Sequence, residues 1–154
     1  MSFLNKKPNI TFKKVTVSDV AELLRIDKST IGSKMYSRFS DEQEAIEEIK
    51  NNEVYFIVKD GKNIGSLEYQ IQGPGHAYLS GLVVLPEFQG QGIAREAVKF
   101  RLDKLKDIKR INLVTHPHNS KVITLYLSLG FHIESWKDNY FGDGEPRIVL
   151  AREK

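Results

Sequence analysis

The sequence predicts a mixed α/β (α+β) fold, in which about six to seven strands form a mostly antiparallel central sheet and about four helices flank it. Three observations lead to this prediction. Runs rich in Val, Ile, Phe and Thr recur along the 154 residues and are typical of short strands. Dipeptide turns separate the middle runs, which indicates hairpins. In two later segments, apolar residues recur every three or four positions, as in amphipathic helices.

Composition narrows the class of protein further. A chain of 154 residues with 40% hydrophobic and 28% charged residues suits one compact domain over residues 1–154. No apolar run approaches the roughly 20 residues that cross a bilayer, and residues 1–8 lack the apolar stretch of a secretory signal. We therefore expect a cytoplasmic protein with no membrane partner. The sequence has no cysteine, which excludes disulfides, thiolate metal sites and cysteine nucleophiles, and we expect no metal.

The charge pattern argues against a nucleic-acid partner. The formal net charge is +3, but the 23 basic residues are scattered among 20 acidic ones. Such mixing is typical of an ordinary solvated surface rather than a basic stripe. A mild positive balance suits an anionic small molecule equally well.

The first elements are a strand and two helices. Residues 9–17 are rich in Ile, Thr, Phe and Val and predict a strand, after which Ser18 or Asp19 can cap a helix that runs to about Asp27. Residues 29–40 are polar and predict a loop, and residues 41–50 predict a short acidic helix. This loop and helix could form the lip of a substrate site.

Three strands should follow as an antiparallel meander. Residues 54–58 are β-branched and aromatic, and Asp60-Gly61 is the dipeptide expected of a tight hairpin turn. Residues 64–71 form the returning strand, and residues 73–75 make a second turn. Residues 77–85 then predict the third strand of the meander.

The remaining segments alternate between helix and strand. After Pro86 the apolar residues follow a helical spacing and predict an amphipathic helix whose inner face carries Ala94, Val98, Leu102 and Leu105, with Ile93 and Ala97 beside them. Residues 110–115 predict another strand, and residues 116–118 a loop. A helix should then begin at Asn119 or Ser120 and end at Gly130, with Phe131 packed back on its last turn. Residues 131–137 and 147–151 predict two closing strands.

The most informative segment runs from Leu82 to Arg95. It predicts a buried strand, a turn, and then two glycines, Gly90 and Gly92, that open a helix. The first N–H groups of a helix lack internal partners, and the aligned peptide dipoles make that end positive. Because glycine has no Cβ, a phosphate can come close to the backbone there. The segment therefore predicts an anion site.

Two familiar phosphate-binding loops do not match this segment. A Walker loop needs a lysine and a hydroxyl residue after its second glycine, but Ile93-Ala94 stands there. A dinucleotide fingerprint needs glycine or alanine where Arg95 stands, and it opens a parallel βαβ unit rather than following a meander. Both alternatives are therefore disfavoured.

A third pattern does match, namely Gln or Arg, two residues, Gly, one residue, and Gly or Ala. Residues 89–94 read Gln-Gly-Gln-Gly-Ile-Ala, which resembles the phosphate-binding turn of the GNAT superfamily of acyl-CoA-dependent N-acyltransferases. The predicted order of strands and helices also resembles that superfamily over almost the whole chain. The resemblance implies the GNAT fold, with a V-shaped splay between the fourth and fifth strands, 77–85 and 110–115.

A second matching element lies at residues 119–131. It is similar to the Asn, Leu-Tyr and Gly-Phe segment of the same family, in which the asparagine meets the pantetheine arm and the tyrosine hydroxyl lies near the cofactor sulfur. The resemblance implies these roles for Asn119 and Tyr126. Each residue also has a purely structural interpretation, with Asn119 as a helix N-cap and Tyr126 as a core aromatic.

The resemblance also implies how acetyl-CoA would be held. Backbone groups of Leu82, Val83 and Val84 would bind the pantetheine as an added strand, and one N–H would stabilise the oxyanion. The backbone N–H groups that would hold the pyrophosphate are those of Gln89, Gly90, Gln91, Gly92, Ile93, Ala94 and Arg95. The side chains of Arg95, Lys99 or Lys121 would add charge at the 3′-phosphate, or they are plain surface.

The reaction implied is transfer of an acetyl group to a primary amine by direct attack in a ternary complex. It needs a neutral amine, a stabilised oxyanion and a proton for the departing thiolate. Tyr126 is our candidate proton donor. Candidates for the base are Glu68, His76, Ser80 and His116, of which we prefer Glu68.

The acceptor amine is left open by the sequence. An aromatic and Gly-Glu stretch at residues 140–145 resembles N-terminal protein acetyltransferases, whose α-amine substrates need little help from a base. Those enzymes often carry Glu or His where Val114 stands here, so a small amine such as a polyamine, amino acid or aminoglycoside is equally compatible. A catalytically silent CoA-binding sensor on the same fold is the alternative function, and the chain could act as a monomer or a homodimer.

Overall fold

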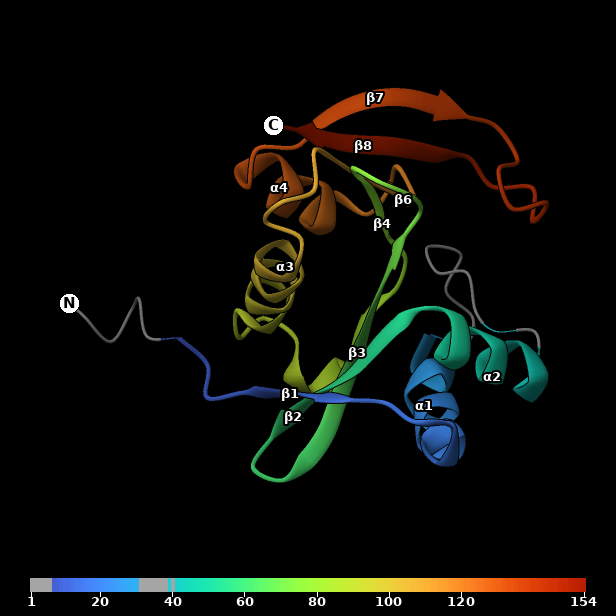
Figure 1. Ribbon diagram of the computed structural model, residues 1–154, viewed down its shortest axis with the longest axis vertical. Coiled ribbons are helices and arrows are strands. Elements are labelled where there is room, and N and C mark those ends of the chain that lie inside the picture. Colours follow the sequence, from blue (N-terminus) through green and yellow to red (C-terminus); the bar gives the residue numbers. More distant parts are fainter. Residues whose placement is uncertain (1–6, 31–38, 40) are drawn as a thin grey trace.

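A computed structural model describes residues 7–30, 39 and 41–154. Seven strands follow one another across the sheet in the order β1-β2-β3-β4-β6-β8-β7, and β5 lies off this path, paired with β3. Helices α1 and α2 lie on one side of the sheet, and α3 and α4 lie on the other (Figure 1). All strand pairs are antiparallel except β4 with β6. The predicted mixed and mostly antiparallel architecture is therefore confirmed.

The bounds of the elements are close to those predicted. The strands are β1 (Thr11–Lys14), β2 (Glu53–Lys59), β3 (Lys62–Ile71), β4 (His76–Leu79), β5 (Leu82–Val84), β6 (Arg110–Thr115), β7 (His132–Lys137) and β8 (Arg147–Glu153). The α-helices are α1 (Val20–Asp27), α2 (Glu42–Asn51), α3 (Ile93–Lys104) and α4 (Ser120–Ser128), and short 3₁₀ turns are η2 (Val17–Asp19), η3 (Lys28–Thr30) and η4 (Pro86–Phe88). No helix in the described ranges is both long and apolar enough to cross a bilayer.

The N-terminal region differs from the prediction in two details. The first strand is shorter than residues 9–17, and the helical region begins earlier than expected. Thr16 caps the 3₁₀ turn η2, where its N–H donates to Asp19 Oδ2 at 2.9 Å in a capping box, and Asp19 is then the N-cap of α1, as predicted. The acidic helix begins as expected, with Asp41 accepting a hydrogen bond from the Glu44 N–H at 2.8 Å. Most of the predicted loop 29–40 lies outside the described residues.

The third strand of the meander is not continuous, and this is a correction. Residues 77–85 divide into β4 and β5, separated by Ser80 and Gly81. Tyr78 lies opposite Gln70 of β3, whereas Leu82 lies opposite Leu67. The strand thus advances four residues while β3 advances three, which defines a β-bulge with one extra residue. The bulge shifts the register and bends the strand.

This bulge coincides with the opening of the sheet. The parallel pairing of β4 with β6 ends at Leu79 and Leu113. Beyond this point β5 pairs with β3, and the last residues of β6, Val114 and Thr115, pair with β8. The two strands therefore separate, and the expected V-shaped splay is confirmed.

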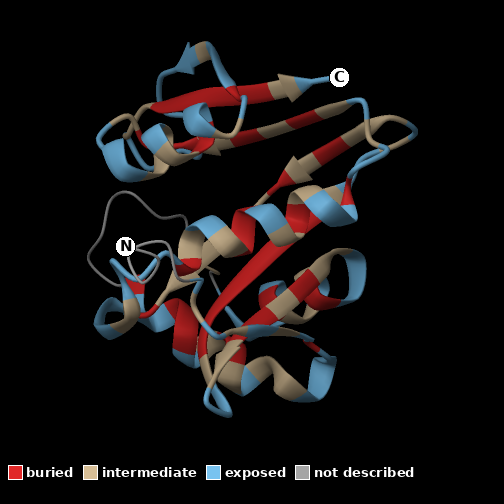
Figure 2. Cartoon of the chain, turned by 90° about the vertical axis from the view of Figure 1, so that its left-hand side faces the viewer, coloured by how far each residue is buried: buried red, intermediate tan, exposed pale blue. Residues whose placement is uncertain are grey.

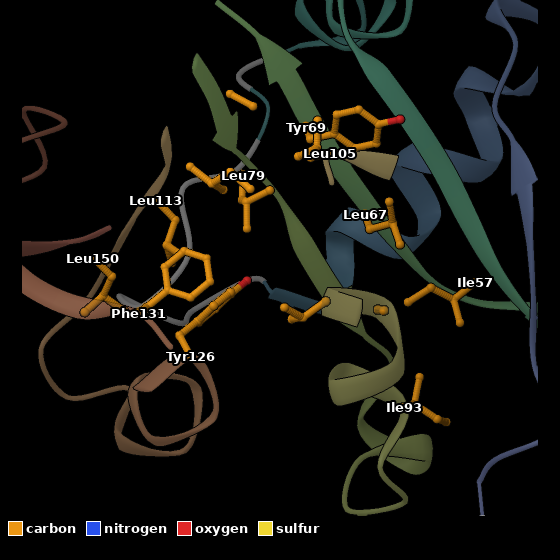
Figure 3. Packing of buried hydrophobic residues seen from close by; sticks show 14 of the residues in the cluster. Ile57, Leu67, Tyr69, Leu79, Ile93, Leu105, Leu113, Tyr126, Phe131 and Leu150 are labelled. Atoms are coloured by element: carbon orange, nitrogen blue, oxygen red, sulfur yellow. The ribbon is translucent and has the colours of Figure 1, made fainter. Parts of the chain in front are cut away.

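Hydrophobic residues are buried on both faces of the sheet. The larger cluster lies against α3 and α4 and includes Leu79, Leu113, Tyr126 and Phe131, which Figure 3 shows near one another. A smaller cluster joins α1 and α2 to the other face of β2. As Figure 2 shows, buried residues run along the central strands while the outer surfaces of the helices are exposed. These two clusters hold the strands on either side of the splay in place.

Helix α3 buries most of the predicted residues and one that was not predicted. Ile93, Ala97 and Val98 are buried, as is Leu105 at its C-cap, whereas the expected Ala94 and Leu102 are only half-buried. The additional buried residue is Arg101, which the predicted apolar face did not include. The end of α4, in contrast, is as predicted. Gly130 has a φ of 91°, and the ring of Phe131 lies against that of Tyr126, with 5.2 Å between the ring centroids.

Gly65 of β3 should be essential for the approach of β5. A Cβ at this position would lie 2.3 Å from the carbonyl oxygen of Val83, so the backbone of β5 would have to move. We expect Gly65→Ala to lower the free energy of unfolding by about 1–3 kcal/mol or more, measured by urea denaturation. The matched control is Gly81→Ala, whose Cβ would lie 3.5 Å from the nearest heavy atom, Glu68 Cδ. Equal effects of the two variants would contradict this explanation.

Candidate active site

A cavity of about 320 Å³ lies where the sheet opens. One wall is the end of β4, the bulge and β5, and the opposite wall is the end of β6. Helices α2 and α4 contribute Glu48, Asn119 and Tyr126, and β3 contributes Glu68. The structure thus brings Glu68, Leu82, Val83, Asn119 and Tyr126 together, as the sequence predicted. Val84 and the glycine turn are not part of the cavity wall.

The main chain of β5 presents alternate residues to the cleft. Gly81 C=O accepts from the Glu68 N–H, and the Leu85 N–H donates to Ile64 C=O, each at 2.9 Å. Because hydrogen bonding alternates along an antiparallel pair, Val83 also directs its main-chain groups to β3. Those of Leu82 and Val84 point the other way. The expectation that all three residues offer backbone groups is therefore corrected.

Val84 is further restricted by the turn that follows it. Its carbonyl oxygen accepts a hydrogen bond from Gln89 Nε2 at 2.9 Å. Among the residues of β5, Leu82 therefore offers its N–H and C=O to the cleft, and Val84 offers its N–H. Val83 contributes its side chain to the cavity wall.

The glycine turn has the backbone conformation that the anion-site prediction requires. Gly90 and Gly92 both have a φ of 80°, a left-handed conformation that glycine adopts without strain. Both are exposed, a Cβ at Gly90 would meet open space, and Gly92 is the N-cap of α3. Lys59 also holds the turn in place, because its Nζ donates a 2.8 Å hydrogen bond to Gln91 Oε1. An anion can therefore approach this helix end.

Side chains of the same segment have structural tasks. Ile93 is buried in the larger core, and Arg95 donates to Ser128 Oγ at 3.2 Å, which ties α3 to α4. Ala94 is half-buried. Any contact of Ile93 or Ala94 with an anion would therefore use the main chain.

The two residues of the second motif face the cavity from α4. Asn119 is the N-cap of this helix, but its side chain makes no capping hydrogen bond. A structural role as the N-cap therefore explains why Asn119 stands at the start of α4. It does not explain why the side chain carries an amide group. Tyr126 is 3% exposed and lines the cavity, and its hydroxyl oxygen accepts a 2.6 Å hydrogen bond from Arg101 Nη2.

Arg101 is the site residue that the sequence reasoning missed. Its side chain is 1% exposed and reaches the cavity from α3. Nη1 donates to the carbonyl oxygens of Glu68 at 3.0 Å and Gly81 at 3.1 Å. The available signal was a charged residue four positions after Ala97 and three after Val98, on the apolar side of the helix.

Glu68 is a buried carboxyl group with an unusual pKa. Only 7% of the residue is exposed, and this burial, together with the neighbouring carboxyl groups of Glu48 and Asp27, raises its pKa to about 8. The guanidinium of Arg101 acts in the opposite direction. A carboxyl group that titrates near neutral pH can act as a general base at physiological pH.

Of the other candidate bases, the two histidines are poorly placed. His76 Nε2 lies 2.6 Å from Asn112 Oδ1, and the buried His116 uses Nε2 toward Glu145 and Nδ1 toward the His118 N–H. Neither histidine lines the cavity. Ser80 does line it, and within the described part of the chain its hydroxyl oxygen is buried without a hydrogen-bond partner.

A sequence profile of the Acetyltransferase (GNAT) family matches residues 18–131. The chain therefore belongs to the GNAT acetyltransferase family, as the glycine turn and the order of elements predicted.

Relatives and solved structures agree with this assignment. The chain is 28% identical over 101 residues to spermidine N(1)-acetyltransferase of Escherichia coli K12, covering 62% of this chain and 54% of that protein. It is 31% identical over 91 residues to the UPF0157 protein YqkA of Bacillus subtilis, covering 58% of this chain and 26% of that protein. The chain thus spans about half of the first relative and about a quarter of the second.

Two solved structures share the fold over nearly the whole chain. The ribosomal-protein-S18-alanine N-acetyltransferase of Escherichia coli has a TM-score of 0.80 at 21% identity, covering 94% of this chain and 93% of that one. A GNAT family acetyltransferase of Elizabethkingia anophelis with acetyl-CoA bound has a TM-score of 0.73 at 22% identity, covering 96% and 100%. At these identities the likeness shows the fold.

Burial of Glu68 should make stability depend on pH. Its folded-state pKa of about 8 exceeds the ordinary value of 4.5, so folding favours the neutral form. The stabilisation is complete below about pH 4.5 and is lost as pH rises toward 8. Relative to Glu68→Gln, the wild-type protein should therefore lose stability over this range, with a slope of at most about 1.4 kcal/mol per pH unit in urea denaturation.

The control for this experiment is Glu47→Gln, an exposed carboxyl group on the same helix as Glu48. This variant should differ from the wild-type protein by an amount that stays constant between pH 5 and pH 8. A constant difference for Glu68→Gln as well would contradict the raised pKa.

Proposed function

We propose that this protein is an N-acetyltransferase that moves an acetyl group from acetyl-CoA to a primary amine by direct attack in a ternary complex. The observation that carries this proposal is the cavity at the splay, which combines outward-facing backbone groups, a buried carboxyl group and a tyrosine hydroxyl. Family membership supports the same reaction. We also propose that residues 1–154 form one acyltransferase domain.

The described residues fit acetyl-CoA. The main-chain groups of Leu82, with the N–H of Val84, would hold the amide-rich pantetheine arm. The N–H groups of residues 89–95 would hold the pyrophosphate at the positive end of α3, where Gly90 leaves open space for it. The amide of Asn119 would reach the arm from the opposite side. When bound, acetyl-CoA supplies the activated acetyl carbonyl and a thiol leaving group.

Glu68 and Tyr126 would divide the proton transfers between them. As the amine forms its bond to the acetyl carbon, Glu68 would take the proton that the nitrogen loses, directly or through water. As the carbon–sulfur bond breaks, Tyr126 would give its hydroxyl proton to the sulfur. Exchange with water then restores both groups. The two residues come from β3 and α4, on different arms of the splay.

We propose a small cationic amine as the acceptor. Among the described residues, Glu48 and Glu68 line the cavity with their carboxyl groups, together with the aromatic residue Tyr78. A second positive charge on the acceptor would be attracted by these groups, and it would favour the ionised form of Glu68 that can act as a base. The name of the spermidine N(1)-acetyltransferase relative is consistent with such an acceptor.

The cellular location, the partners and the oligomeric state are also part of this proposal. We propose a cytoplasmic enzyme, because that is where its acetyl donor would be available. Acetyl-CoA and the amine would be its partners, and it would work as a monomer or a homodimer.

The function can be tested by titration calorimetry with acetyl-CoA, followed by a thiol-release assay on the same sample. The amine panel should contain diamines and polyamines, their monoamine analogues, an aminoglycoside, an amino acid and a short peptide with a free N-terminus. We expect binding, and turnover that is highest for the diamines or polyamines. If turnover were highest with the peptide, the acceptor would be a peptide α-amine and not a small cationic amine. Binding without turnover for any amine would favour the silent sensor.

Gly92→Val should weaken acetyl-CoA binding by at least tenfold. The added side chain would stand where the pyrophosphate must approach α3, and it would strain a residue with a φ of 80°. Titration calorimetry measures the dissociation constant. Gly144→Val is the matched control, because Gly144 has a φ of 82° and lies in the loop between β7 and β8, so it carries the same strain elsewhere. Unchanged affinity in Gly92→Val would remove the turn from the binding site.

A further inference from the structure

Arg101 is a buried charged residue that has no role in the reaction proposed above. Its described hydrogen-bond partners are two main-chain carbonyls and the hydroxyl of Tyr126, none of which carries a full negative charge. Within the described residues, its Nε has no hydrogen-bond partner although it is buried. A guanidinium in such surroundings is costly to bury, so its position in the cavity wall calls for a physical reason.

The geometry connects Arg101 to three parts of the site at once. Nη1 binds the carbonyl of Glu68 on β3 and the carbonyl of Gly81 in the bulge, while Nη2 binds Tyr126 on α4. A lysine could not make these contacts together, because they use the fixed fork of the guanidinium. Arg101 therefore joins the strand of the candidate base to the helix of the candidate acid.

The direction of the hydrogen bond to Tyr126 has a chemical consequence. Arginine can only donate, so the phenol oxygen is the acceptor at 2.6 Å. The tyrosine's own hydrogen must therefore point away from Arg101, and Tyr126 lines the cavity. The nearby positive charge also compensates for the negative charge that develops on the oxygen as the proton leaves.

We propose that Arg101 is the positioning residue for Tyr126, which orients the hydroxyl as a proton donor toward the departing thiolate and stabilises the phenolate formed by that transfer. This inference rests on the proposed acetyltransferase function. The proton moves from the tyrosine oxygen to the sulfur as the carbon–sulfur bond breaks, and water returns a proton to the oxygen.

A double-mutant cycle tests the coupling between the two residues. The proteins are the wild type, Arg101→Met, Tyr126→Phe and the double variant, and the readouts are kcat, the acetyl-CoA dissociation constant and the thermal midpoint. We expect Tyr126→Phe to lower kcat about 100-fold and Arg101→Met at least about tenfold. The double variant should lie within threefold of Tyr126→Phe, because Arg101 has no proton donor left to orient. The dissociation constant should change less than threefold throughout.

Two further variants separate this role from a structural one. Lys104→Met removes an exposed charge of the same helix and should leave kcat unchanged. Arg101→Lys keeps the charge but loses the fork, and it should recover part of the kcat lost in Arg101→Met. It also serves if Arg101→Met does not fold.

A readout independent of turnover is the ¹³Cζ resonance of Tyr126 in tyrosine-labelled protein, assigned by its loss in Tyr126→Phe. It should move in both Arg101 variants and stay in place in Lys104→Met. Multiplicative losses of kcat in the double variant, an unmoved resonance, or full kcat in Tyr126→Phe would each overturn the inference while leaving the acetyltransferase function intact. A wild-type protein that binds acetyl-CoA but acetylates no amine would overturn the function, and this role with it.

Discussion

The site depends on one interruption in strand pairing. The extra residue between β4 and β5 shifts the register on β3 by one position, and beyond it β4 no longer has a continuation that can pair with β6. Unpaired main-chain groups are normally a liability at a sheet edge, but here they line a cleft where an extended, amide-rich ligand can pair with them. Gly65 permits the close approach of β5, and Arg101 binds the carbonyl of Gly81 within the bulge.

Burial gives the cleft its chemistry. Glu68 is largely removed from water and lies close to Glu48, so both effects favour its neutral form, whereas Arg101 favours the ionised form. The same arginine binds the hydroxyl of Tyr126 on the facing side. A binding cleft, a carboxyl group that titrates near neutrality and a tyrosine are thereby coupled through one buried guanidinium.

The family does not by itself define the acceptor. A solved structure of similar fold is named as a ribosomal-protein-S18-alanine N-acetyltransferase, and a relative in sequence is named for spermidine. Val114 lines the cavity without a titratable group, and Glu68 supplies a carboxyl group from a different strand. The proposed choice of a small cationic amine rests on the carboxyl groups of Glu48 and Glu68 in the cavity wall.

Local sequence patterns determined most of the fold. Turn chemistry at Asp60-Gly61, helical spacing after Pro86 and the glycine at position 130 are short-range signals, so the meander and the bounds of α2, β6 and α4 followed from neighbouring residues alone. The motifs at residues 89–94 and 119–131 likewise identified the family and placed Asn119 and Tyr126 at the site.

Tertiary structure decided what depends on contacts between distant segments. The break at Ser80–Gly81 is invisible in a continuous β-rich run, because a bulge is defined by the register against β3. Which backbone groups of residues 82–84 face the cleft follows from the same register. Sequence patterns did not single out Arg101, because its burial results from contacts with β3, the bulge and α4 that form only in the folded structure. Sequence patterns reflect the local conformational preferences of the chain, whereas burial and strand pairing depend on contacts that form only when the chain folds.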